Sequence, residues 1–461
     1  MTMLAGALSA VFWGVIILSI LVFVHEGGHY LAARAFGVRV TEFYLGLPCR
    51  FKLFHKSKKH GTEVGVTPFL LGGYNRICGM EGEDDELAAP AFAIVQREGR
   101  VDVTALAEEL GIEVERAYAI LVMLSDLAAI RPYYNPELGE YPTQKDYPAA
   151  FETIARDAHM LTEYDDKHDF TQPGSTGDAE PRPLEDAKAQ LDQEVSHTYK
   201  GVSVPKRLVI LIAGVLVNIL VAFVLTTCVY MATDVPMYVN KNEIGSVSEG
   251  SIAEAAGLAA GDTILRVGDT EVSDWESLTA ALKSCCKAGE DFTIVYERDG
   301  AQATATLDLP EGEETELIGV TAPVEIYHPT LLESMRGAVN YAGLVLSTVV
   351  KLIVPQHTME VLDQSSSIVG ISVAASEAAS SGLLDVIALM AAISMSLGFM
   401  NLLPIPPLDG GKILIEFVQV IIRKPLSIKA QTAISYVGLA FFAFVFVVVV
   451  RNDVARIFFG G

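Results

Sequence analysis

Four long apolar stretches constrain the fold of this 461-residue chain more than any other feature. They lie at roughly 7–33, 208–232, 383–405 and 431–450. A helix needs about 20 mostly apolar residues to span a membrane, and each stretch is long enough. We therefore predict a polytopic α-helical membrane protein with four transmembrane helices.

The distribution of lysine and arginine predicts how these spans are oriented. Both residues gather after the first span, before the second and after the third, and none precedes the first. Short cytoplasmic loops carry the excess of positive charge. Residues 34–207 and 411–430 are therefore expected on the cytoplasmic side, with both termini outside. Only Arg451 and Arg456 oppose this orientation.

Residues 337–354 form a further apolar stretch, which Asn340 and Lys351 interrupt. Helical spacing gives this stretch a polar edge, which is typical of a helix at the membrane surface. We favour such a helix, lying on the membrane or dipping into it, over a fifth span. A fifth span would also break the alternation of charge across the other four.

The chain combines 51% apolar residues with a formal net charge of −24. Its acidic residues lie mostly in 81–200 and 240–316, which we interpret as two soluble insertions. Nucleic acid and anionic lipid favour basic surfaces, so neither is expected as the main partner. The five cysteines include no C-x-x-C pair, which argues against a disulfide scaffold or a zinc ribbon.

Ionisable residues inside the first apolar stretch are the strongest functional signal. The segment "HEGGH" places His25 and His29 four residues apart, so both imidazoles lie on one face of a helix. That spacing lets them bind one metal ion, with Glu26 beside them to take a proton from a water. A chance match, or histidines bonded to neighbouring helices, would be the alternatives. Ionisable groups within a span are costly and usually functional, which favours the metal site.

A catalytic zinc site uses three protein ligands, and Asp409 is the best third candidate. It lies in "NLLPIPPLDGGK" (401–412), at a depth in the third span similar to that of His25 in the first. The prolines of this segment should break the helix, and irregular backbone is tolerated in a membrane only where it lines a cavity. Asn401 could then bind substrate or support the site. A kinked helix end with Asp409 as a solvent-facing cap is the alternative.

"HEGGH", "NLLPIPPLDGG" and "LLGGY" (70–74) together closely resemble the motifs of the site-2 protease family of intramembrane zinc metalloproteases. The resemblance covers about 1–80 and 200–461, and the most similar type is the bacterial regulator-of-sigma-E protease, which carries an extracytoplasmic PDZ region. It implies one zinc ion per chain, with Glu26 as the catalytic acid and base. In 367–374, Val-Gly replaces the family's Gly-Pro pair. The residues given roles by the resemblance are His25, His29 and Asp409 for zinc, and Gly72, Gly73, Tyr74, Asn401 and Pro404 for substrate.

The resemblance also implies a substrate class and a location. Expected substrates are single-span membrane proteins such as anti-sigma factors trimmed outside the membrane, or remnant signal peptides. A helical substrate must unwind before cleavage, and adding it as a strand to a membrane-dipping β-hairpin at 62–78 would satisfy its backbone. The expected location is the bacterial inner membrane, with the active site toward the cytoplasm.

Residues 240–325 alternate strand-like stretches with turns and resemble a bacterial PDZ domain. A strand is expected at 262–267, and Asp274 can cap a following helix. PDZ domains bind an extended peptide along a strand edge, so a peptide or a substrate ectodomain is the expected partner. We place that edge at Ile244, Gly245, Ser246 and Val247. The alternative is a domain that only excludes bulky substrates.

Residues 81–164 are predicted to form a winged-helix-like insertion, with helices at about 103–110 and 113–129. The acidic character of the last helix argues against DNA binding. A regulatory protein partner and a purely structural role are both open. Residues 165–200 are polar and rich in turn formers, which predicts a disordered linker. His159, His168 and His197 show no ligand spacing and are expected to be solvated.

A zinc endopeptidase that cleaves transmembrane segments is the predicted function. A non-catalytic membrane scaffold presenting the PDZ and winged-helix modules is the main alternative, and it would not need Glu26. A metal-ion transporter would show inverted repeats and several intramembrane carboxylates, and the sequence has neither. The remaining expected divisions are the first span with its β-hairpin (1–80), the second span (201–234), a membrane-surface helical region (326–380) and the last two spans (381–461).

Overall fold

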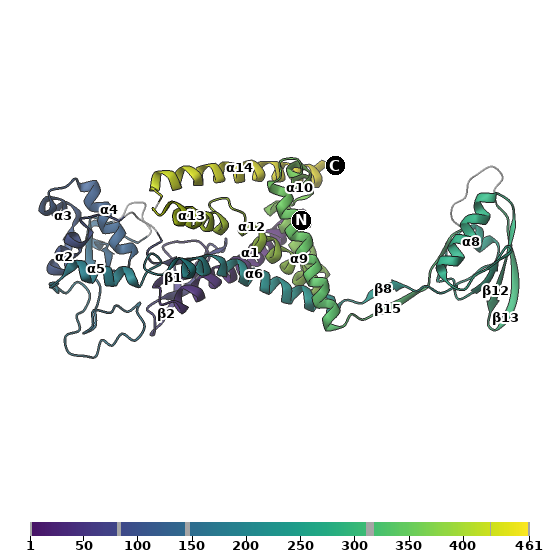
Figure 1. Ribbon diagram of the computed structural model, residues 1–461, viewed down its shortest axis with the longest axis horizontal. Coiled ribbons are helices and arrows are strands. Elements are labelled where there is room, and N and C mark those ends of the chain that lie inside the picture. The colour runs from purple at the N-terminus through teal and green to yellow at the C-terminus, as the bar shows by residue number, and fades with distance from the viewer. Residues whose placement is uncertain (1, 81–83, 143–147, 310–317, 425, 460–461) are drawn as a thin grey trace. The chain divides into compact units, whose positions relative to one another are not determined.

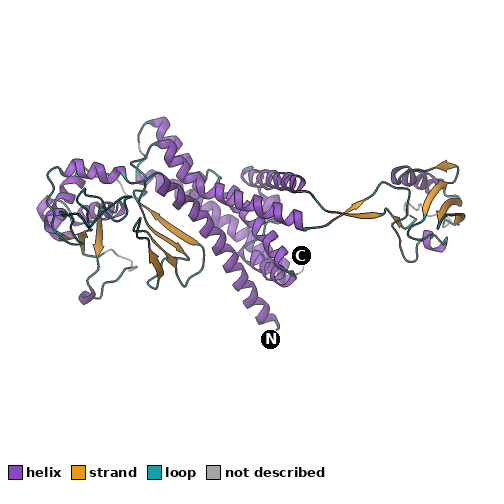
Figure 2. Ribbon diagram, turned by 90° about the horizontal axis from the view of Figure 1, so that it is seen from below, coloured by secondary structure: helices purple, strands orange, loops and turns teal. Residues whose placement is uncertain are grey.

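The computed structural model describes residues 2–80, 84–142, 148–309, 318–424 and 426–459 (Figures 1 and 2). The chain divides into two compact units, which are described separately. The first contains Met1–Val229 and Met335–Gly461, and the second contains Tyr230–Ser334. Residues 81–83 and 143–147 of the expected cytoplasmic insertion, and 310–317 of the expected PDZ domain, lie outside the described residues.

Four helices of the first unit are long and apolar enough to cross a membrane, which confirms the predicted number of spans. The apolar segments are Ala5–Ala35, Val204–Ala232, Leu383–Asn401 and Lys429–Ala455. They belong to α1 (Thr2–Ala35), α6 (Val204–Ala232), α12 (Leu383–Asn401) and α14 (Ile428–Phe459).

Four further helices of the described chain after residue 330 are not among the candidate spans. The ambiguous stretch at 337–354 is helical within α9 (Leu331–Ile353), which is not one of the four candidate spans. The third span ends at Asn401, earlier than its apolar run, because three prolines follow. The remaining helices here are α10 (Thr358–Gln364), α11 (Ile368–Ser381) and α13 (Asp409–Ile422).

A four-stranded sheet follows α1. Its strands are β1 (Val40–Leu45), β2 (Leu53–Lys56), β3 (Glu63–Val66) and β4 (Gly73–Ile77), in the order β2-β3-β1-β4. This differs from the expected hairpin at 62–78, because β1 lies between β3 and β4. It pairs parallel with β3 and antiparallel with β4. β3 and β4, which are consecutive in sequence, are therefore not neighbours in the sheet.

One face of this sheet packs against α1. The Phe43 ring of β1 stacks on Phe23 at 4.4 Å and on Tyr30 at 5.0 Å between ring centroids, and both partners belong to α1. Gly73 lets β4 approach the helix, since a Cβ atom there would lie 2.9 Å from the Tyr44 carbonyl oxygen and 3.3 Å from Phe23 Cα. Side chains alternate between the faces of a strand, so Tyr44 and Tyr74 stack on the opposite face.

Residues 84–200 form a small α/β region with its own core. Its strands pair antiparallel in the order β5-β7-β6. The core includes Phe92, Leu106, Leu121, Leu124 and Phe151. The elements are α2 (Ala88–Glu98), β5 (Arg100–Asp102), α3 (Val103–Leu110), α4 (Val114–Asp126), β6 (Ile130–Tyr133), a 3₁₀ turn (Pro136–Leu138), β7 (Ala150–Thr153) and α5 (Ala187–Ser196).

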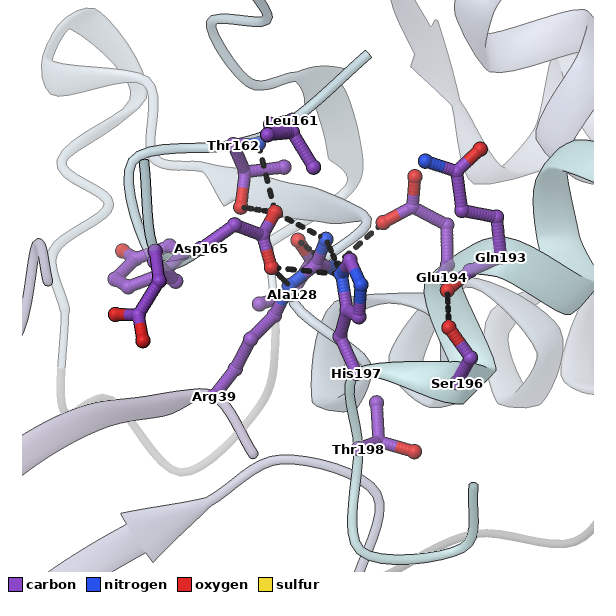
Figure 3. Close-up of polar contacts among 12 residues, drawn as sticks. Arg39, Ala128, Leu161, Thr162, Asp165, Gln193, Glu194, Ser196, His197 and Thr198 are labelled. Atoms are coloured by element: carbon purple, nitrogen blue, oxygen red, sulfur yellow. Dashed lines mark hydrogen bonds and ion pairs between the residues drawn. The ribbon is translucent and has the colours of Figure 1, made fainter. Parts of the chain in front are cut away.

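Residues 165–200 are ordered, contrary to the disordered linker that their composition predicts. A cluster of buried ionisable side chains, which we call the Arg39 cluster (Arg39, Arg156, Asp165 and Glu194), anchors them just before β1. Figure 3 shows Arg39, Asp165 and Glu194 of this cluster. Arg39 Nε lies 2.7 Å from Asp165 Oδ1, and its Nη1 lies 2.5 Å from Glu194 Oε2. Arg156 Nη1 donates to Glu194 Oε1 at 2.6 Å. A prediction from composition assumes that these carboxylates are solvated. In the structure, Arg39 and Arg156 neutralise them instead.

Two further details belong to this cluster. His197 is not simply solvated as expected, because its Nδ1 lies 2.8 Å from Asp165 Oδ1. Burial alone would raise the pKa of Asp165, but hydrogen bonds from His197 and Arg39, together with the charge of Arg39, hold that pKa well below its usual range. The carboxylate is therefore ionised across the neutral range.

The second unit is built on a four-stranded sheet of order β11-β10-β12-β13 and two shorter pairs, β14-β9 and β15-β8. Asp274 caps α8 through its side chain and the Ser277 amide, which confirms the predicted cap. The elements are β8 (Val235–Tyr238), β9 (Ser246–Val247), α7 (Ile252–Ala255), β10 (Thr263–Val267), β11 (Thr270–Glu271), α8 (Trp275–Ala288), β12 (Phe292–Arg298), β13 (Ala301–Leu307), β14 (Val320–Thr321) and β15 (Val324–Tyr327).

Candidate metal centre

Three predicted ligands lie together in the first unit. His25 Nε2 is 3.0 Å from Asp409 Oδ2, His29 Nε2 is 3.2 Å from the same oxygen, and the two Nε2 atoms are 3.3 Å apart. All three residues are buried. The two histidines occupy one face of α1, while Asp409 comes from the start of α13.

Small residues bring α6 against this face of α1. A Cβ atom on Gly28 would lie 2.6 Å from the Ala213 carbonyl oxygen. A Cβ atom on Gly214 would collide with the His29 ring. Both positions therefore need glycine, because any side chain would separate the helices or displace a histidine. Gly214 was not among the predicted site residues, because its local signal is only a glycine within an apolar run.

Partners from α6 orient the two imidazoles. The Ile210 carbonyl oxygen lies 2.7 Å from His29 Nδ1, so that nitrogen carries the proton and Nε2 presents its lone pair to the cluster. The Asn218 amide lies 3.3 Å from His25 Nδ1. Its Oδ1 atom is buried and has no hydrogen-bond partner among the described residues. With that oxygen turned to Nδ1–H, His25 would also present a free lone pair.

The proline-rich segment places Asp409 in the cluster. After α12 ends at Asn401, the chain turns back, and α13 begins at Asp409. Gly410 and Gly411 pack so closely on the backbone of 402–406 that neither tolerates a side chain. Asp409 is 8% exposed, which excludes the alternative of a solvent-facing cap. Lys412 lies 3.9 Å from its second oxygen.

This donor set fits a zinc ion. Tetrahedral zinc with bonds of about 2.0–2.1 Å holds its ligand atoms about 3.3 Å apart, close to the separations in the cluster. The set combines two imidazole nitrogens with one carboxylate oxygen, as catalytic zinc sites often do. Among the described residues this is the one group of three or more such side chains that could hold a metal.

Glu26 does not share the face of His25, but it lies three residues before His29 and so borders the metal-ligand face of α1. Phe23, Glu26 and Tyr30 follow helical spacing along the side that contacts the sheet. Asn75 of β4 donates to Glu26 Oε2 at 2.7 Å and to the Glu26 carbonyl oxygen at 3.0 Å. Asn75 was not among the predicted site residues, because nothing local distinguishes it from any strand asparagine.

The residues predicted to bind substrate do not all lie near the metal centre. Gly72 and Gly73 lie beside α1 near Val22 and Phe23. The Tyr74 hydroxyl donates to Glu42 at 2.7 Å on the sheet face turned away from α1, so its side chain does not reach the cluster. Asn401 ends α12, and Pro404 lies in the turn that leads to Asp409.

The segment of the predicted peptide edge at 244–247 already makes some backbone hydrogen bonds within the second unit. The Ile244 amide donates to Asp262 and its carbonyl accepts from Gly261, and its side chain is buried in the core. The Gly245 amide donates to Thr321, and Ser246–Val247 pair with Val320–Thr321. Among the described strands β9 pairs with β14 alone, so one of its edges has no partner strand there and the peptide edge at 244–247 stays a prediction.

Comparison with known proteins adds independent findings. A model of peptidase family M50 matches residues 13–445. The chain is 29% identical over 453 residues to the zinc metalloprotease RasP of Shouchella clausii, covering 96% of this chain and 98% of that protein. It is 28% identical over 451 residues to the probable protease eep of Enterococcus faecalis, with the same coverage. The regulator of sigma-W protease RasP of Bacillus subtilis is 23% identical over 448 residues, again with the same coverage.

Proposed function

From the premise that this chain belongs to peptidase family M50 and is a membrane zinc metalloprotease of the site-2 type, we propose that His25, His29 and Asp409 bind its zinc and that Glu26 is the catalytic acid and base. The observation that carries the proposal is the convergence of three ligand atoms 3.0–3.3 Å apart from helices distant in sequence. When bound, zinc supplies the Lewis acidity that activates a water and polarises a peptide carbonyl.

The protein's own groups would then carry the proton and hold the substrate. Glu26 accepts a proton from the attacking water and returns it to the leaving amine. Ile210 and Asn218 keep the histidine rings oriented. The burial of the cluster keeps bulk water away, which strengthens the electrostatic interactions inside it.

The sheet beside α1 suggests how a helical substrate is presented. A helix hides its carbonyl groups in internal hydrogen bonds, so the cleaved segment must be extended. The edges of the sheet are β2 and β4, and β4 is the strand that contacts Glu26. Strand addition along the free edge of β4 would satisfy the substrate backbone beside the catalytic base. In this proposal Gly72, Gly73 and Tyr74 shape the strand, and Asn401 and Pro404 line the opposite side.

The proposed substrates are single-span membrane proteins of the anti-sigma-factor type or remnant signal peptides. The relative named regulator of sigma-W protease supports this class. We further propose a bacterial inner-membrane location with both termini outside and the active site on the cytoplasmic side. The lysines and arginines flanking the spans support that orientation.

The two soluble regions have proposed roles of their own. The second unit, within 240–325, is proposed to be a PDZ domain that binds a peptide along 244–247 or limits substrate size. The order of helices and strands in 84–164, including the antiparallel order β5-β7-β6, supports a winged-helix-like module. A regulatory protein is its proposed partner.

Replacing the base tests the function. In detergent, the unmodified protein should cleave a tagged reporter with one apolar segment that contains central helix-weakening residues. Glu26→Gln should reduce cleavage to background while the purified protein keeps one zinc per chain. His25→Ala should lose both cleavage and zinc. Cleavage by Glu26→Gln at the unmodified rate would leave a scaffold as the better interpretation.

A further inference from the structure

Asn75 links the sheet to the catalytic helix at one point. Its amide nitrogen lies 2.7 Å from the Glu26 carboxylate oxygen and 3.0 Å from the Glu26 carbonyl oxygen. One NH2 group therefore contacts the side chain and the backbone of the same residue. A carboxylate that accepts from an amide in a half-buried position is held more firmly than one bonded to water.

The geometry explains why Glu26 needs such a partner. Successive residues of a helix point about 100° apart, so Glu26 projects away from His25 toward the sheet. Phe23, Phe43 and Tyr30 form a stack along the same contact. Within this contact the glutamate has a flexible side chain, and Asn75 is the polar group of β4 that meets it.

Resting on the proposed function, we propose that Asn75 is a positioning residue that holds the Glu26 carboxylate for proton transfer and couples its orientation to β4. The asparagine does not touch the metal ligands and need not contact substrate. β4 is also the proposed docking edge for substrate. A shift of that strand would therefore change the orientation of the Glu26 carboxylate directly. Misplacing a catalytic group by about 1 Å can reduce the rate about 100-fold.

Kinetics of Asn75→Val test the proposal with the single-span reporter described above. We expect kcat to fall about 10- to 100-fold, with KM within about threefold and one zinc per chain retained. The matched control is Thr41→Val in the same sheet, whose hydroxyl makes only a long 3.5 Å contact with the Arg76 carbonyl. This control should keep kcat within about twofold. An Asn75→Val enzyme with unmodified kcat, or one that has lost zinc, would overturn the proposal.

A second measurement is independent of activity. Thermal unfolding midpoints are compared for the unmodified protein, Asn75→Val, Glu26→Ala and the double variant, all stripped of zinc. If Asn75 holds the carboxylate, Asn75→Val should lower the midpoint by about 2–4 °C alone and by clearly less in the Glu26→Ala background. Additive shifts would overturn the proposal. Coupled shifts without any cleavage by the unmodified protein would instead reject the proposed function and leave the Asn75–Glu26 bond standing.

Discussion

Two buried polar clusters of the first unit differ in how their charges are balanced. The Arg39 cluster pairs two arginines with two carboxylates, so its charges balance within the cluster. The candidate metal centre brings together two imidazole nitrogens and a carboxylate oxygen, whose three ligand atoms lie close to one another. The charges of the first balance without a ligand, whereas the second offers donor atoms that could hold a metal cation. Burial alone therefore does not mark a functional site, but burial with uncompensated acceptors does.

Replacing a ligand should produce the largest effect. Asp409→Ala removes the oxygen that contacts both histidines, so zinc and cleavage should be lost together, with activity falling about 1,000-fold or more. Metal analysis and reporter cleavage measure the two losses. Asp165→Ala, from the other cluster, is the comparison and should leave the zinc content at one per chain. A zinc-replete Asp409→Ala protein would show that the carboxylate is not a ligand.

Breaking the Arg39 cluster should cost stability instead. Arg39→Met leaves Asp165 and Glu194 buried without part of their counter-charge, which typically costs about 3–5 kcal/mol. Residues 157–198 should then exchange amide hydrogens faster while zinc stays bound. Mass spectrometry of hydrogen exchange makes this measurement. Arg97→Met, which removes an exposed ion pair on α2, is the matched control and should change little. Unchanged exchange in Arg39→Met would mean that the cluster does not order this segment.

The same contrast explains what the sequence could predict. Apolar runs and the His25–His29 spacing are local patterns, so the spans and two ligands follow from short stretches. Asp409 could also be predicted from the sequence, because the prolines around it imply that the helix breaks at membrane depth. The contacts of three supporting residues are all with partners far away in the chain: Asn75, Asn218 and Ile210. No local sequence pattern predicts these contacts.

The errors have the same origin. The composition of residues 165–200 is typical of a disordered segment. Arg39 and Arg156 nevertheless neutralise the Asp165 and Glu194 carboxylates of this segment. The predicted hairpin at 62–78 was wrong, because β1, from an earlier segment of the chain, lies between β3 and β4. Pairing between distant segments is the information that composition lacks.

An intermediate effect is expected at the support of the metal centre. Asn218→Ala removes the amide that contacts His25 Nδ1 and leaves the three ligands in place. Loss of such a supporting bond usually weakens metal binding about 10- to 100-fold. Competition with a chelator of known zinc affinity measures the change. Thr227→Ala, on the same helix and bonded only to the Phe223 carbonyl, is the control. An unchanged zinc affinity in Asn218→Ala would mean that the Asn218 contact is incidental.

The smallest predicted effect is a pH dependence confined to the Arg39 cluster. The pKa of Asp165 is lower in the folded protein than its unfolded value of about 3.9. A depressed pKa contributes stability that is present above the unfolded value and is lost as the pH falls toward the folded one. Pepsin cleavage within 157–198, normalised to an unstructured peptide, should therefore increase between about pH 4 and pH 2. Asp165→Asn cannot titrate, so its cleavage should be higher at pH 4 and should rise less on further acidification. Parallel curves for the two proteins would assign the acid sensitivity to another group.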